Sequence, residues 1–149
     1  MRIRLPILVL LVALTPLCSR TQSTGSHASE NISRFVGVWR GQFDNLPGVD
    51  LVITNEGGGL RGAILFYLHK RADANRPYTS SAGLPEPIFN IRPDGQILHF
   101  RVSHRRAHPP ATLQDAPKDF DLKLTGPDHA QLTNESGDAP GLTMTRTDY

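Results

Sequence analysis

Cysteine, tryptophan and helical periodicity are all scarce in this chain of 149 residues. Cys18 is the only cysteine, so no internal disulfide can form. No stretch after residue 28 repeats its apolar residues every 3.6 positions, which excludes an amphipathic helix as the main element. The Gly-x-Ser-x-Gly signature of a nucleophilic serine is also missing. We therefore expect one all-β domain, and we do not expect an enzyme or a bound cofactor.

Residues 1–28 have the layout of a secretory signal peptide. Arg2 and Arg4 precede an apolar run from Leu5 to Leu17, and small polar residues follow it. The run is shorter than the roughly 20 residues that a membrane-spanning helix needs. We expect a secreted or periplasmic protein. Cys18 offers the alternative of a lipid anchor, although a bacterial lipobox has a small residue where this chain has Leu17.

Neither sign of charge dominates the chain once this segment is set aside. The whole sequence has 16 Lys and Arg and 14 Asp and Glu, and residues 1–28 account for three of the arginines and none of the acids. The remainder is thus close to neutral, which argues against a nucleic-acid partner. A membrane partner is expected only if Cys18 is lipidated. The partner that remains is a small molecule or a protein of the cell envelope.

The rest of the chain alternates apolar and polar residues in short runs separated by Gly- and Pro-rich turns. We interpret residues 29–33 as a disordered leader and residues 34–149 as one domain. The predicted strands are 34–43, 49–54, 60–68, 87–92, 96–103, 118–125, 129–133 and 141–147. Eight strands in sequence predict an antiparallel up-and-down barrel, in which the last strand pairs with the first. A flat sheet or a two-sheet sandwich is the alternative.

The predicted barrel has two different ends. Short turns at 55–59, 93–95 and 126–128 lie at one end, and the long connections 69–86 and 104–117 lie at the other. The large side chains predicted to face inward are Trp39, Phe43, Phe66, Phe89, Phe100 and Phe120. An eight-stranded barrel is only wide enough to fill itself or to hold one small ligand, and we expect a largely filled interior.

The stretch Gly37-Val38-Trp39, early in the first of eight strands, resembles the Gly-x-Trp signature of the lipocalins and the wider calycin group. A longer pattern is also similar to small exported bacterial proteins of unknown function: Gly-x-Trp-x-Gly, a Gly-rich turn, Leu60-Arg61-Gly62-Ala63 and a C-terminal Leu-Thr-x-Thr-Arg. The resemblance implies a lipocalin-like barrel in which Trp39 packs across the closed end. It further implies that an arginine near the last strand, here Arg146, covers the indole. Gly37, Trp39 and Arg146 are thus expected to have structural roles.

The long-loop end is where we expect a ligand, because it is locally basic. The candidate ligand-binding residues are Arg71, Tyr78, His104, Arg105 and Arg106. They indicate a small anionic or amphipathic ligand, or a partner, at the barrel mouth. The alternative is a structural or accessory envelope module with a filled core and no small ligand. His104 and His108 have a metal-ligand spacing, but Pro109 and Pro110 argue against a helix and no third ligand is evident, so we expect no metal site.

Overall fold

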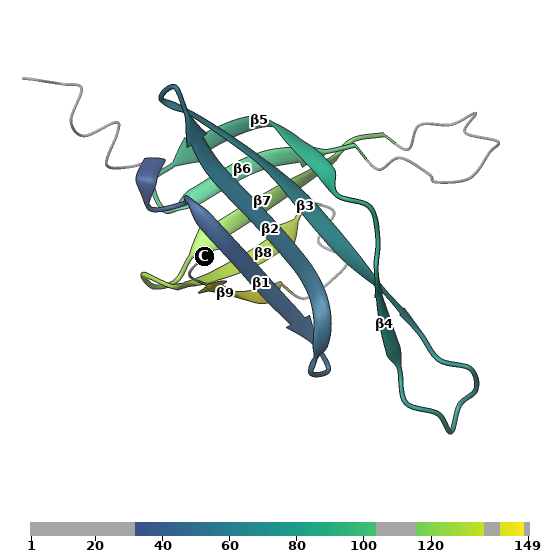
Figure 1. Cartoon of the computed structure of the whole chain (residues 1–149). Coiled ribbons are helices and arrows are strands. Elements are labelled where there is room, and N and C mark those ends of the chain that lie inside the picture. Colours follow the sequence, from purple (N-terminus) through teal and green to yellow (C-terminus); the bar gives the residue numbers. More distant parts are fainter. Residues whose placement is uncertain (1–31, 104–115, 136–140, 148–149) are drawn as a thin grey trace, which may run out of the picture.

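The sheet closes on itself into a barrel (Figure 1). The computed structural model describes residues 32–103, 116–135 and 141–147. Within these ranges the strands are β1 (Gly37–Phe43), β2 (Leu46–Glu56), β3 (Gly59–Lys70), β4 (Thr79–Ala82), β5 (Glu86–Asp94), β6 (Ile97–Val102), β7 (Lys118–Leu124), β8 (His129–Asn134) and β9 (Leu142–Thr147). No helix in these ranges is long and apolar enough to cross a bilayer.

Pairing of β1 with β9 closes the barrel, which confirms the predicted fold. Val38 lies opposite Thr147, and Gly41 lies opposite Met144. All the strand pairs are antiparallel, and β4 pairs only with β3, so the other eight strands form the closed wall. Closure removes the unpaired edges that the first and last strands would otherwise expose. The flat-sheet and sandwich alternatives are excluded.

The prediction of a long loop over residues 69–86 is partly wrong. Residues 79–82 pair with 67–70, so β3 continues past the barrel wall and returns as β4 in a long hairpin. The run Thr79-Ser80-Ser81-Ala82 has no large apolar residue to mark it as a strand. It is held by its neighbour instead, because the hydroxyls of Thr79 and Ser81 donate to backbone carbonyls of β3, at 3.1 and 3.4 Å.

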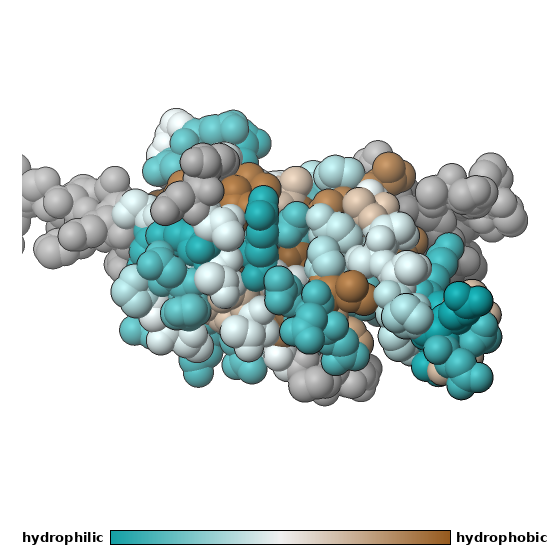
Figure 2. Space-filling model, turned by 60° about the horizontal axis from the view of Figure 1, so that its bottom comes forward, coloured by the Kyte–Doolittle hydropathy of each residue, from teal (hydrophilic) through white to brown (hydrophobic). Residues whose placement is uncertain are grey.

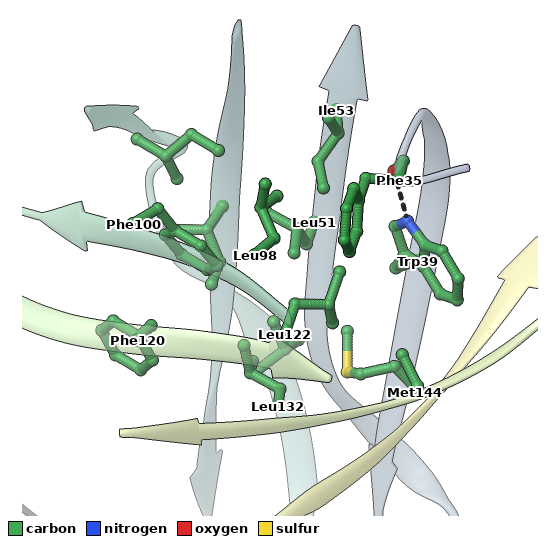
Figure 3. Packing of buried hydrophobic residues seen from close by; sticks show 14 of the residues in the cluster. Phe35, Trp39, Leu51, Ile53, Leu98, Phe100, Phe120, Leu122, Leu132 and Met144 are labelled. Atoms are coloured by element: carbon green, nitrogen blue, oxygen red, sulfur yellow. Dashed lines mark hydrogen bonds between the residues drawn. The ribbon is translucent and has the colours of Figure 1, made fainter. Parts of the chain in front are cut away.

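Inward-facing apolar side chains fill the barrel, with Trp39, Phe35 and Phe100 the largest of those that are fully buried (Figure 3). Phe35 reaches the core from a turn rather than from the predicted strand 34–43. The amide of Phe35 donates to the carbonyl of Ile32 at 3.2 Å, and that of Val36 to the carbonyl of Ser33 at 3.1 Å. The turn places the Phe35 ring over the end of the barrel beside Trp39 (Figure 3).

Two of the aromatic residues predicted to face inward do not. Phe43 is 56% exposed, because the register shifts between Gly41 and Gln42 and interrupts the alternation. Phe89 also lies on the outer face, because a bulge follows it and Ile88 is buried in its place. A bulge inserts an unpaired residue and so reverses which side chains face the core. Both errors thus have the same cause. A bulge shifts the strand by one residue, and a prediction that assumes strict alternation does not include that shift.

Candidate functional site

The closed end of the barrel is sealed by contacts around Trp39. Its indole Nε1 donates a hydrogen bond to the carbonyl of Phe35 at 2.9 Å, so the buried donor is satisfied. The guanidinium carbon of Arg146 lies 4.6 Å from the centre of the indole ring. The same guanidinium donates to the carbonyl of Arg34, whose own side chain donates to the carbonyl of Gly95. These contacts tie the first turn, β1, the β5–β6 turn and β9 together.

Gly37 allows this packing. Its φ is +146°, a value that residues with a side chain rarely adopt. A Cβ at this position would lie 3.2 Å from Cδ of Arg146, so it would also press on the arginine that covers Trp39. The Gly-x-Trp pattern therefore has a local physical reason, independent of any family.

We expect Arg146→Met to lower the free energy of unfolding by about 2 kcal/mol. The variant keeps much of the apolar stem but loses the cation over the indole and leaves the Arg34 carbonyl without its donor. Denaturant unfolding followed by fluorescence of Trp39 measures this change. Arg40→Met is the matched control, because the Arg40 side chain is 60% exposed and its ion pair with Asp50 is 3.8 Å long. Equal losses in the two variants would contradict a special role for Arg146.

The end of the barrel opposite Trp39, called here the open end, is where β1 and β3 finish and where the predicted long connections begin. Inside it, the ring of Phe120 lies 5.8 Å from that of Phe66 and 5.8 Å from that of Phe100, and stacks on the latter. Asn134 lies opposite Phe120 on the interior face, and its Oδ1 is buried with no hydrogen-bond partner among the described residues. An orphaned acceptor beside aromatic rings is suited to a ligand that carries a donor.

The rim of the open end carries charges of both signs. Glu86 lies opposite Ile64 and therefore faces inward, as does Lys118 opposite Val102. The inward facing of these two residues was not predicted, because it depends on a strand register that the long connections hide. The described rim thus carries acidic as well as basic side chains.

The β3–β4 hairpin projects from this end, on the right of Figure 1, and forms a hydrophilic lobe on the right of Figure 2. Its base is tied to β2, because Ser80 Oγ and His69 Nε2 both bind the carbonyl of Pro47, at 3.1 and 2.7 Å. Nearby on the outer wall, the hydroxyl of Tyr67 donates to Asp50 at 3.0 Å. That hydrogen bond, with burial, raises the pKa of Tyr67 above 10.0. The hairpin is therefore anchored at its base.

The structure brings together two of the five predicted ligand-binding residues. At the tip of the hairpin, the guanidinium of Arg71 lies 5.0 Å from the ring centre of Tyr78. Arg71 also donates to the carbonyl of Ala74 at 3.4 Å. His104, Arg105 and Arg106 lie outside the described residues, so their position relative to this pair stays a prediction. His108, the other half of the disfavoured metal pair, lies outside them as well.

Large apolar side chains are exposed at this same end. The exposed large hydrophobic residues of the described ranges are Phe43, Leu68, Tyr78 and Leu84. Phe43 ends β1, Leu68 lies on β3 beyond the barrel wall, and Leu84 lies between β4 and β5. The ring of Phe43 contacts that of His69, with 5.7 Å between their centres. Of this set the sequence predicted only Tyr78 at this end, and it placed Phe43 in the core.

The described residues form no group of three or more His, Cys, Asp or Glu side chains suited to a metal ion. No family model, curated protein sequence or solved structure matches the chain. The described residues show a closed barrel with Trp39 packed near one end and the β3–β4 hairpin projecting from the other, and the chemistry of that second end has to be argued from its own side chains.

Proposed function

We propose that this is an exported lipocalin-like binding protein, which takes a small anionic and amphipathic ligand, or a partner, at the open end of the barrel. One observation supports this most: the large exposed apolar side chains of the described residues all lie at the open end. Exposed apolar groups that gather in one place on a soluble domain are typical of interaction sites. Export is proposed from the signal-like residues 1–28, and membrane anchoring would require a lipid on Cys18.

The hairpin supplies the polar part of the proposed site. Lys70, Arg71 and Arg76 lie on or near its tip, with Asp73 as the local counter-charge, 3.8 Å from Arg76. Arg71 has a guanidinium that is exposed and held over Tyr78, so it can meet an anionic group at little further cost in side-chain entropy. Leu68 lies on the same hairpin, three residues before Arg71, and can meet an apolar tail. An anionic amphiphile matches this combination of groups.

Titration with dodecanoate, an anionic amphiphile, tests the proposal. We expect it to raise the unfolding midpoint of the full chain, because a ligand that binds only the native state stabilises it. Arg71→Ala should weaken the affinity measured by calorimetry by about threefold to tenfold. Arg61→Ala is the control, since Arg61 lies at the other end of β3 and pairs with Glu56 at 3.2 Å. Equal affinities of both variants would refute the assignment of Arg71.

The filled interior supports a second candidate function, a structural or accessory module of the envelope without a small ligand. The inward side chains between Trp39 and Phe120 pack against one another (Figure 3). The interior at this end of the barrel therefore stabilises the fold rather than binding a ligand. Failure of dodecanoate and of uncharged dodecanol to change the unfolding midpoint would favour this module. In that case the exposed residues at the open end are expected to contact a protein.

A further inference from the structure

A depression of about 470 Å³ lies on the outer wall of the barrel, over β5, β6 and β7. This volume falls in the range of small-molecule sites. The residues with polar side chains that line it are Asn90, Arg92, His99, Arg101, Asp119, Asp121 and Glu135. None of the residues that line it belongs to the β3–β4 hairpin, so it does not depend on the function proposed above.

Two rows of side chains cross the strands here. Arg92 lies opposite His99, and His99 lies opposite Asp121. In the next row, Arg101 lies opposite Asp119. Their neighbours Phe100 and Phe120 are buried, so by alternation these polar residues face outward. The depression is therefore lined by a regular pattern of charged groups at successive strand positions.

The polar side chains within the rows are paired at short distances. His99 Nδ1 lies 2.6 Å from Oδ1 of Asp121, and Arg101 Nε lies 2.8 Å from Oδ1 of Asp119. The four side chains are 29–39% exposed, so they are half-buried and held in place while still open to a ligand. Each pair keeps hydrogen-bonding capacity, because a carboxylate has a second oxygen and a guanidinium has further N–H groups.

A β-bulge makes room beside these pairs. Phe89 pairs with Arg101 and Arg92 pairs with His99, so Asn90 and Ile91 together oppose the single residue Phe100. Asn90 has a φ of +52°, which is uncommon for a residue other than glycine. Bulges and such backbone conformations are frequent next to functional sites, where they redirect side chains. Here the bulge places Asn90 and Ile91 at the border of the depression.

We propose that this depression binds a neutral polyhydroxylated ligand, such as a sugar unit of a glycan. Arg92 and Arg101 offset Asp119 and Asp121, and Glu135 adds one further carboxylate, so the site has no large excess of either sign to attract a simple anion or cation. It instead presents fixed donors and acceptors side by side, as vicinal hydroxyl groups require, since each hydroxyl both donates and accepts. The amide of Asn90 adds one more donor and acceptor, and Ile91 adds an apolar border.

Titration of the ¹⁵N-labelled chain with two neutral trisaccharides, cellotriose and N,N′,N″-triacetylchitotriose, tests the proposal. We expect at least one of them to shift the amide resonances of residues 90–92, 99–101 and 119–121 with millimolar affinity. Asp119→Ala and Arg92→Ala should each weaken that affinity by about fivefold or more. Arg92 is exposed, so its variant keeps the fold even if the loss of an ion pair disturbs that of the Asp119 variant.

The control variant is Glu56→Ala, which removes an exposed ion pair from another part of the sheet and should leave the affinity unchanged. Three outcomes would overturn the proposal. These are shifts confined to the open end, unchanged affinity in the Arg92 variant, and no shift with either sugar. Larger shifts of the same amides with inorganic phosphate, or with an uncharged short peptide, would overturn it in favour of an anion or a peptide site.

Discussion

Replacing Trp39 by alanine is expected to lower the free energy of unfolding by about 3–5 kcal/mol. The indole is fully buried, donates to the Phe35 carbonyl and packs beneath the guanidinium of Arg146. Its removal leaves a cavity at the point where the first turn, β1 and β9 meet, and it leaves an unpaired carbonyl as well. A small domain has only about 5–15 kcal/mol of stability in total, so the variant should be close to unfolding at ambient temperature.

Denaturant unfolding followed by circular dichroism measures this effect, since the variant lacks the only tryptophan. Phe43→Ala is the matched control, because it removes an aromatic side chain from the same strand at the exposed end. Its cost should stay below about 1 kcal/mol. If Phe43→Ala proved as costly as Trp39→Ala, the sealed and open ends would contribute equally to stability, contrary to the division of the barrel described above.

Alternation and turn residues were enough to predict the barrel wall. The alternating runs and the Gly-rich turns gave eight strands in an up-and-down order, and closure of β1 on β9 follows from that order. The prediction of strands and of inward-facing residues failed where the pairing with a neighbouring strand, and not the alternation of the sequence itself, determines the conformation. Ser80 belongs to a strand only because β3 extends beside it, and Phe43 and Phe89 left the interior because bulges shift the register.

The candidate sites were harder to predict from the sequence than the fold. Arg71 and Tyr78 are near in sequence, so their contact at the hairpin tip could be anticipated. The outer depression could not, because the long connection 103–117 separates β6 from β7 and conceals their register. In the sequence, Asp119 and Asp121 alternate with Phe120 and Leu122, which predicts only that the two carboxylates lie on the outer face and aid solubility. The two carboxylates do face outward, but their partners, Arg101 and His99, become evident only once β6 and β7 are aligned.

The second large loss of stability is expected from a substitution at Gly62, where the backbones of β2 and β3 lie close together. A Cβ at this position would lie 2.2 Å from the carbonyl oxygen of Val52 and 3.0 Å from Cδ1 of Ile88. The oxygen belongs to the backbone of the paired strand, so it cannot turn aside as a flexible side chain would. We expect Gly62→Ala to lower the free energy of unfolding by about 3 kcal/mol, at the upper end of the usual cost of overpacking.

Thermal and denaturant unfolding of Gly62→Ala beside Gly59→Ala separates this effect from a general intolerance of β3 to side chains. A Cβ at Gly59 would meet only the carbonyl oxygen of Glu56, at 3.8 Å, which is an ordinary contact. Gly59→Ala should therefore be nearly neutral, or slightly stabilising through the loss of unfolded-chain entropy. A neutral Gly62→Ala would mean that β2 and β3 can separate without loss. The wall of the barrel would then not be the rigid support on which both proposed sites depend.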